Sequence, residues 1–192
     1  MNKVAASQLT FHPLTPKRWK DFERLFGTRG ACGGCWCMSW RLKRAVFEQQ
    51  KGDGNKSAMK KIVSSGEIPG VIAYAGTEPI AWCSVAPREA FPRLENAPTL
   101  KRIDDKPVWS VVCLFIAKPY RRRGVSSLLL KAAVDYARER GATVVEGYPF
   151  EPNQKLPDPF VWTGLVSSFT AAGFKEAARR SASRPIMRYY IK

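Results

Sequence analysis

The stretch that decides the fold is VWSVVCLFIAKPYRRRGVSSLLLKAAVDYARERGATVVEGYP, residues 108–149. Residues 108–117 are too apolar for a half-exposed strand and predict a central strand buried on both faces. Residues 125–140 carry apolar side chains at helical spacing, and Gly141 follows them as a C-terminal stop. Residues 143–149 predict a second strand. We expect the two strands to lie parallel, joined by a right-handed crossover through the helix.

The flanking sequence predicts the remaining elements of one mixed α/β domain. Hydrophobic patterns place a strand at 8–14, a helix from Thr15-Pro16 to Phe26, helical segments near 39–50 and 56–65, a hairpin of 70–76 and 80–86, a helix at 162–172, and strands at 174–180 and 185–191. The connection 87–107 is long for a structureless loop, so we expect a short helix near 88–95 or a functional flap. The sequence has no repeat, which favours a single domain over residues 1–192 with a mixed central sheet flanked by helices.

Basic residues outnumber acidic ones 32 to 16, which gives a formal net charge of +16 spread along the chain. This charge favours an anionic partner, such as a phosphorylated small molecule, nucleic acid or an acidic surface. A well-solvated basic surface explains the charge equally well. The longest apolar run, Val111–Ala117, is far shorter than the about 20 residues of a membrane-spanning helix. Five cysteines and no apolar leader favour a cytoplasmic protein with reduced thiols.

An anion-binding turn is predicted at residues 118–126, between the buried strand and the helix. The unpaired N–H groups and the partial positive charge of a helix N-terminus suit an anion. Gly124 lacks the Cβ atom that would keep a phosphate away from those amides, and three successive arginines at 121–123 supply forked donors. Ser126 adds a small hydroxyl side chain. The pattern predicts a diphosphate cradle; the alternative is an ordinary turn with solvated arginines.

This turn and the order of the elements resemble the GNAT superfamily of N-acetyltransferases. Tyr120, Arg121, Gly124 and Ser126 match the acyl-CoA-binding signature of that superfamily, in which the position of Ser126 is more often glycine or alanine. The order of elements agrees over nearly the whole chain. The resemblance implies a GNAT-like acyl-CoA N-acyltransferase fold that transfers an acetyl group from acetyl-CoA to a primary amine by direct attack, without a metal.

The resemblance also implies where acetyl-CoA binds. The diphosphate would lie on the amides of residues 122–126, and the pantetheine arm would lie along residues 114–116, where the two parallel strands splay apart. A backbone N–H group there would polarise the thioester carbonyl, as oxyanion stabilisation requires. The predicted acetyl-CoA-binding residues are Leu114, Phe115, Ile116, Arg121, Arg122, Arg123, Gly124, Val125 and Ser126.

Two departures from the family pattern concern proton transfer. Many members carry a tyrosine, which protonates the departing thiolate, where this chain has Phe169, and residues 108–117 lack the carboxylate that serves as base in some relatives. Glu146 and Tyr148 share one face of the second strand by two-residue alternation. We predict that Glu146 takes the amine proton, directly or through water, and that Tyr148 protonates the sulfur. The alternatives are a salt bridge for Glu146 and simple packing for Tyr148.

The predicted acceptor-binding residues come from segments that flank the acceptor pocket in the resembled fold. Trp36, Met38 and Trp40 would line the pocket, and plain core packing is the alternative for them. Arg88 and the proline-rich connection 149–159, with Trp162 after it, are candidate flaps over the acceptor site. The acceptor, a small-molecule or peptide amine, is not identified by the sequence. The net charge argues against a polycationic acceptor.

The cysteine-rich segment allows a metal site as an alternative. Cys32, Cys35 and Cys37 could share a zinc ion, but a structural zinc site has four ligands, and His12 or Cys83 would have to complete it. A redox Cys-x-x-Cys motif is a second alternative. We favour a glycine-containing loop with small buried thiols and expect no metal.

Three further expectations concern function. Cys113 lies on the buried strand, where inert packing is favoured over an acyl-accepting nucleophile because His12 is an unpromising base. A basic nucleic-acid-binding module and a non-catalytic acyl-CoA-binding protein are the alternative functions, and Phe169 keeps the second of them open. We expect no nucleic-acid or membrane partner, and a monomer or homodimer.

Overall fold

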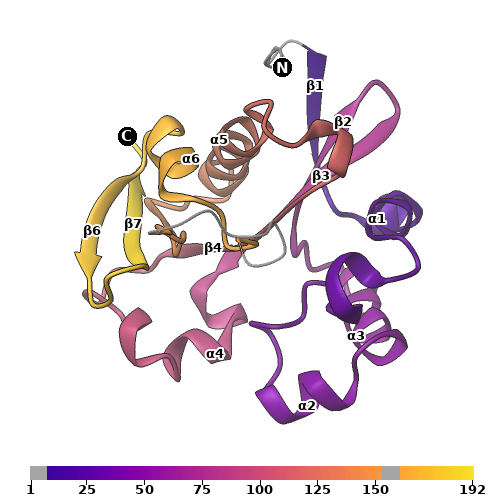
Figure 1. Ribbon diagram of the computed structural model, residues 1–192, viewed down its shortest axis with the longest axis horizontal. Coiled ribbons are helices and arrows are strands. Elements are labelled where there is room, and N and C mark those ends of the chain that lie inside the picture. The colour runs from indigo at the N-terminus through magenta and orange to yellow at the C-terminus, as the bar shows by residue number, and fades with distance from the viewer. Residues whose placement is uncertain (1–7, 153–160) are drawn as a thin grey trace.

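One seven-stranded mixed sheet forms the centre of the computed structural model, which describes residues 8–152 and 161–192. Its strand order is β1-β2-β3-β4-β5-β7-β6, so β4, the buried strand predicted from the sequence, lies in the middle (Figure 1). The strands are β1 (Leu9–Pro13), β2 (Gly70–Ala75), β3 (Glu78–Pro87), β4 (Trp109–Ile116), β5 (Val144–Gly147), β6 (Lys175–Arg179) and β7 (Pro185–Tyr190). β4 and β5 pair in parallel, and the other neighbouring strands pair antiparallel. The predicted mixed α/β architecture is confirmed.

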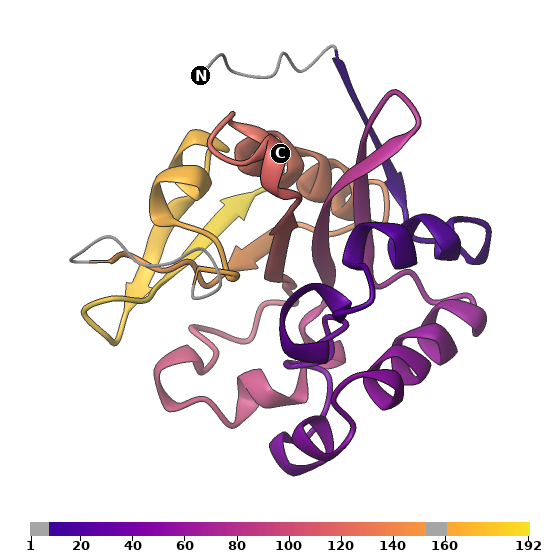
Figure 2. The same ribbon diagram turned by 45° about the vertical axis from the view of Figure 1, so that its right-hand side comes forward.

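Helices cover both faces of the sheet (Figures 1 and 2). They are α1 (Trp19–Phe26), α2 (Arg44–Gln49), α3 (Asp53–Ser64), α4 (Pro92–Glu95), α5 (Val125–Arg138) and α6 (Val166–Ala171). α1 to α4 bury apolar side chains, such as Phe22 and Met59, in one core, and we call this side the α1–α4 face. α5 and α6 bury theirs, such as Leu129 and Phe169, in a second core on the opposite side, the α5–α6 face.

β4 and β5 separate after a short paired stretch. Residues 109–111 of β4 pair with residues 145–147 of β5, and β5 ends before Pro149, which cannot donate a ladder hydrogen bond. On its other edge, β4 stays paired with β3 as far as Ile116. Beyond Val111, the β5-facing edge of β4 is therefore not covered by that strand.

A β-bulge in β4 turns two successive side chains to the same face of the sheet. Cys113 pairs with Ser84 and Val111 pairs with Val85, which leaves Val112 as the extra residue. Val112 and Cys113 both pack in the core of the α1–α4 face, whereas Val111 packs on the α5–α6 face. The bulge therefore brings Cys113 beneath the cysteine-rich segment.

Two helix starts differ from the sequence prediction. The helix predicted at 162–172 begins only at Val166, so Trp162 lies in the turn before α6. The Thr15 hydroxyl makes no capping hydrogen bond, and Pro16, whose fixed φ suits a first turn, opens a short helical segment before α1.

The long connection between β3 and β4 is not structureless. It contains the helical segments Arg88–Ala90, α4 and Pro98–Leu100, which confirms the expected short helix. Among the described residues, no helix is long and apolar enough to cross a membrane.

Gly147 allows the ring of Phe169 to pack directly on β5. A Cβ atom at position 147 would overlap Phe169 Cε1, and Phe169 is fully buried. We therefore expect Gly147→Ala to lower the free energy of unfolding by about 1–3 kcal/mol, measured by urea denaturation. In a Phe169→Leu background, Gly147→Ala should lower the free energy of unfolding clearly less. An equal loss of stability in both backgrounds would show that the Phe169 ring is not the obstacle.

Candidate active site

The turn between β4 and α5 leaves open space above a helix N-terminus. Gly124 has a φ of +80° and directly precedes α5, and a Cβ atom built on it would meet nothing within 4 Å. Arg122 also has a positive φ, of +58°. The Arg121 Nε group donates to the carbonyl of Ile116 at 2.8 Å, which fixes the turn to the end of β4. The predicted cradle therefore has the required backbone shape.

The donors at this turn suit an anion. The first N–H groups of α5 have no partner within the helix, as at any helix N-terminus. The Arg123 Nε atom is buried without a hydrogen-bond partner in the described structure. The Ser126 hydroxyl lies 3.0 Å from the Ser168 hydroxyl, so this small side chain also joins α5 to α6. An orphaned guanidinium donor beside an uncrowded glycine fits the predicted diphosphate.

The open edge of β4 carries two of the three amides that the sequence suggested for the thioester, those of Leu114 and Ile116. The Leu114 N–H donates to the carbonyl of Trp162 at 2.7 Å, whereas the Ala117 N–H donates to Ile80 of β3. Because N–H groups alternate along a strand, the Ile116 amide faces the same edge as that of Leu114, and the Phe115 amide faces β3. The three predicted amides are thus not equivalent, and that of Phe115 points away from the opening.

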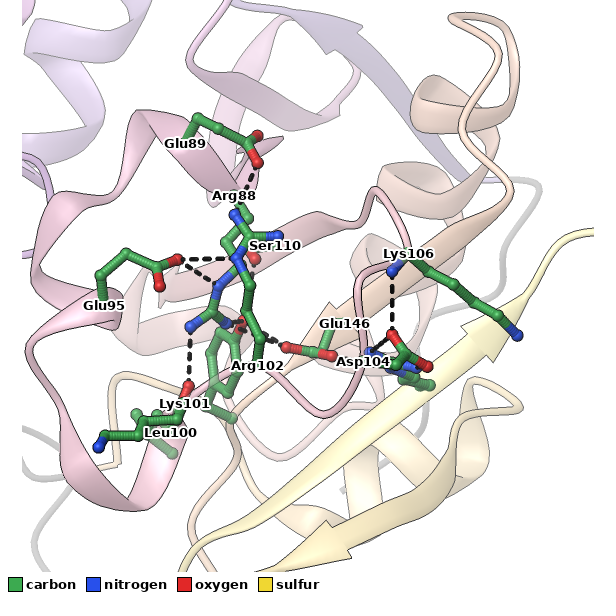
Figure 3. Close-up of polar contacts among 12 residues, drawn as sticks. Arg88, Glu89, Glu95, Leu100, Lys101, Arg102, Asp104, Lys106, Ser110 and Glu146 are labelled. Atoms are coloured by element: carbon green, nitrogen blue, oxygen red, sulfur yellow. Dashed lines mark hydrogen bonds and ion pairs between the residues drawn. The ribbon is translucent and has the colours of Figure 1, made fainter.

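A buried polar cluster lies across β3, β4 and β5 (Figure 3). Arg88 Nη1 donates to Glu146 Oε1 at 3.2 Å and to the Tyr148 hydroxyl at 2.7 Å. Tyr148 in turn donates to Glu146 Oε1 at 2.7 Å, and its oxygen lies 2.9 Å from the Ser110 hydroxyl. Arg88 is 0% exposed and Glu146 is 1% exposed. The face shared by Glu146 and Tyr148, predicted by alternation, is therefore a direct contact.

The cluster continues through charged groups towards the surface. Arg188 Nε donates to Glu146 Oε2 at 2.8 Å, and its Nη atoms bind Asp104. Arg88 also binds Glu95 and the carbonyl of Leu100 (Figure 3). Both oxygens of Glu146 are therefore engaged by guanidinium groups, which compensate its buried charge.

The surroundings of Tyr148 hold its proton. Burial, together with the negative charge of Glu146, raises the pKa of Tyr148 well above its usual range. Hydrogen bonding to Asp104 raises the pKa of Arg188. The cluster is therefore an ordered arrangement of a neutral phenol, a carboxylate and two guanidinium cations.

Part of this cluster was not predicted from the sequence. Arg88 was expected on a flap, apart from Glu146 and Tyr148, and no site role was predicted for Ser110, Asp104 or Arg188. Ser110 is the one polar residue in the apolar run 108–117, a signal that was available. The partners of Arg88 are 58 and 60 residues away, which no local spacing reveals.

Three of the predicted acceptor residues, Trp36, Met38 and Trp40, are buried, and Trp162 is partly buried. Residues 153–159 of the predicted flap lie outside the described residues. Trp36 and Met38 are buried in the core of the α1–α4 face, and the Trp36 ring stacks on Phe26 at 5.7 Å. The core alternative therefore describes these two side chains in this conformation. Trp40 is buried in the same core, and its ring also lies 6.0 Å from the half-buried ring of Trp162. The structure thus brings together predicted residues from two distant segments.

The cysteines do not gather around a metal. Among the described residues, no group of three or more histidine, cysteine, aspartate or glutamate side chains could hold a metal ion. Cys83 packs on the α5–α6 face, opposite Cys37. His12 lies in β1, three strands and about 14 Å from β4, and packs edge-on against Tyr74 of β2. Within the part of the chain that the structure describes, therefore, neither His12 nor Cys83 completes a metal site with Cys32, Cys35 and Cys37.

Comparisons with known proteins agree with this architecture. The model of the acetyltransferase (GNAT) family matches residues 37–156, more than half of the chain. No curated protein matches the sequence. A PaiA N-acetyltransferase from Thermoplasma acidophilum, solved with coenzyme A, superposes with a TM-score of 0.53 at 14% identity, covering 95% of this chain and 99% of its own.

Two further solved structures are similar in fold. A putative arylalkylamine N-acetyltransferase from the yellow fever mosquito has a TM-score of 0.59 at 13% identity, covering 96% of this chain and 88% of its own. A GNAT-family acetyltransferase from Listeria monocytogenes has a TM-score of 0.59 at 8% identity, covering 99% of this chain and 100% of its own.

Proposed function

Because the chain belongs to the acetyltransferase (GNAT) family, we propose that it moves an acetyl group from acetyl-CoA to a primary amine by direct attack of the amine on the acetyl carbon. The observation that carries the proposal is the turn at residues 118–126. There an uncrowded glycine of positive φ precedes the fourteen-residue helix α5 on the central strand.

Acetyl-CoA supplies the activated acetyl group, and this chain's residues hold it. We assign its diphosphate to the amides of residues 122–126 and to Arg123, whose Nε atom has no partner in the described structure. Arg121 secures the turn through Ile116 and adds positive charge. These assignments follow from the donor set, since amides and guanidinium groups are the natural partners of phosphate oxygens.

The uncovered edge of β4 is the proposed place for the thioester. The Ile116 amide faces that edge, and we assign it to the pantetheine arm or the acetyl carbonyl. The Leu114 amide donates to the backbone carbonyl of Trp162, so it can bind the acetyl carbonyl only after that hydrogen bond is broken. An oxyanion that forms at this edge would be stabilised by amides already fixed by strand pairing.

For the amine proton we propose a relay that ends at Glu146. Tyr148 already donates to Glu146, and the Tyr148 oxygen is within reach of Ser110, so the hydroxyls of Ser110 and Tyr148 form a directed path. This gives Tyr148 a different role from the one predicted by sequence. Its raised pKa makes it a weak acid for a departing thiolate but a suitable link between two oxygens.

We place the acceptor on the α1–α4 face, near the ring pair of Trp40 and Trp162. The guanidinium of Arg93 lies 5.5 Å from the Trp40 ring and donates to the Ser39 carbonyl. Aromatic rings and a cation favour an amine that carries an apolar or anionic group. The same surroundings, together with the net charge of +16, disfavour a polyamine.

Thiol release from acetyl-CoA, measured across a panel of primary amines, tests the proposed function. The panel should hold arylalkylamines, amino acids, peptides with free N-termini, polyamines and aminoglycosides. Amine-dependent release of CoA thiol supports the transferase. Tight acetyl-CoA binding without turnover on any amine would instead support the non-catalytic acyl-CoA-binding alternative, which Phe169 keeps open.

The proton relay makes a separate prediction for Tyr148→Phe. Loss of the hydroxyl interrupts the path to Glu146, so kcat should fall about 100-fold while the KM for acetyl-CoA stays unchanged. Tyr136→Phe is the matched control, because Tyr136 is a buried tyrosine on the α5–α6 face, away from the cluster. A fully active Tyr148→Phe enzyme would end the proposed relay.

A further inference from the structure

Cys37 differs from two other buried or partly buried cysteines in the direction of its hydrogen bonds. The indole Nε1 of Trp82 donates to Cys37 Sγ at 3.2 Å, and an indole nitrogen can only donate. The thiols of Cys35 and Cys83 instead donate to backbone carbonyls, at 3.4 Å and 3.9 Å. The thiols of Cys35 and Cys83 therefore act as donors, whereas the sulfur of Cys37 accepts a hydrogen bond, an arrangement that favours its thiolate form.

A second thiol and a buried cation add to this arrangement. The Cys113 thiol, which packs in the same core, the Ser84 side chain and the guanidinium of Arg41 all lie near enough to Cys37 to act on the pKa of its thiol. Burial alone would raise the pKa of Cys37, but the hydrogen bonds outweigh it and lower the pKa to about 7. The pKa of Cys113 is raised, first by its hydrogen bond to Cys37 and then by burial.

The backbone fixes both sulfurs where they meet. Cys37 and Trp36 have positive φ angles of +60° and +42°. Residues other than glycine adopt this backbone conformation only at an energetic cost. Cys113 reaches the same space because the β-bulge turns it to the α1–α4 face. A thiolate-stabilising site and a protonated thiol are thereby held together between the cysteine-rich segment and the central strand.

We propose that Cys37 and Cys113 form a redox-active thiol pair that hydrogen peroxide converts to a disulfide. The Cys37 thiolate attacks one peroxide oxygen, the O–O bond breaks, and hydroxide leaves, so Cys37 becomes a sulfenic acid. The Cys113 sulfur then attacks Cys37, the S–O bond breaks, and the departing hydroxide takes the Cys113 proton to form water. The two sulfurs lose two electrons in total, which the peroxide gains.

The disulfide would tie the cysteine-rich segment to β4 at the residue before Leu114. That link joins the segment carrying Trp36 and Trp40 to the strand that holds the proposed thioester edge. The turn at 118–126 is not part of the link. Oxidation should therefore leave acetyl-CoA binding intact, and it does not depend on the proposed transferase activity.

Peptide mapping of the full chain tests the pair directly. Reduced protein is treated with a slight excess of hydrogen peroxide, its remaining thiols are alkylated, and the tryptic peptides are analysed by mass spectrometry. Cys37 and Cys113 lie in different tryptic peptides, 30–41 and 103–121. We expect these peptides to become linked, with fragment ions assigning the bond to Cys37 rather than to Cys32 or Cys35, and a reductant should separate them.

Two variants sharpen the test. Cys113→Ala should give no link and should leave Cys37 as a sulfenic acid that dimedone traps, whereas Cys83→Ala, which removes a buried thiol on the opposite face, should link as the wild type does. If Cys113→Ala fails to fold, the wild-type map alone decides. A link through Cys32 or Cys35, oxidation of Cys83 as fast as of Cys37, or no link at all would overturn the proposal.

Discussion

Replacing Gly124 with glutamate is expected to weaken acetyl-CoA binding at least 100-fold, about 2.7 kcal/mol. The space beside Gly124 is open, so the new side chain fits sterically but places a carboxylate where the diphosphate is assigned. The glutamate carboxylate and the diphosphate are both negatively charged and repel each other strongly when they are close together. The added Cβ atom also blocks the approach of the phosphate to the backbone amides. Isothermal titration calorimetry measures the change in dissociation constant.

Gly141→Glu is a matched control for this substitution. Gly141 lies at the other end of α5 with a φ of +77°, close to the +80° of Gly124, and its Cβ position is equally open. Both variants should therefore lose the same roughly 1 kcal/mol of stability from the left-handed backbone. Only Gly124→Glu should lose binding. Equal affinities in the two folded variants would remove the diphosphate site from the turn.

Arg88→Ala is expected to lower the free energy of unfolding by about 3–5 kcal/mol. Arg88 is fully buried and donates to Glu146, Tyr148, Glu95 and the Leu100 carbonyl. Its removal leaves part of the charge on Glu146 uncompensated. It also removes the hydrogen bonds that hold the connection between β3 and β4 against the sheet. The midpoint and slope of urea denaturation measure the loss.

Arg102→Ala is the control that distinguishes the effect of a buried arginine from the effect of losing a positive charge on the same connection. Arg102 stands on the same connection and also pairs with Glu95, but its side chain is 34% exposed. We expect this substitution to cost less than about 1 kcal/mol, as for other solvent-exposed ion pairs. Similar losses in the two variants would contradict the view that the buried cluster, rather than charge on the connection, stabilises this side of the sheet.

The fold could be predicted from sequence where the signal is local. The apolar run 108–117, the helical spacing after it and the glycine between them are contiguous, and each dictates its own element through burial or backbone freedom. Strand alternation predicted that Glu146 and Tyr148 share a face, and the structure adds the hydrogen bond between them. Local patterns thus gave the central strand, the helix, the turn and one pair of site residues.

The remaining site could not be read from spacing because its partners are distant in the chain. Arg88 reaches β5 only because β3 and β5 flank β4, and Cys37 reaches Cys113 only through a bulge that no composition signals. From the sequence, Glu146 was either a catalytic base or a salt-bridge partner. The structure shows salt bridges to Arg88 and Arg188, and also hydrogen bonds that link Glu146 through Tyr148 to Ser110. The core packing of Trp36 and Met38 likewise depends on tertiary contacts that the local sequence does not reveal.

A crystal structure of the chain with bound coenzyme A would show where the diphosphate binds. We expect the diphosphate oxygens within hydrogen-bond distance of the main-chain N–H groups of residues 122–126, with the thiol end at the β4 edge beyond Val111. A diphosphate bound elsewhere on the protein, with those amides turned to other partners, would contradict this assignment.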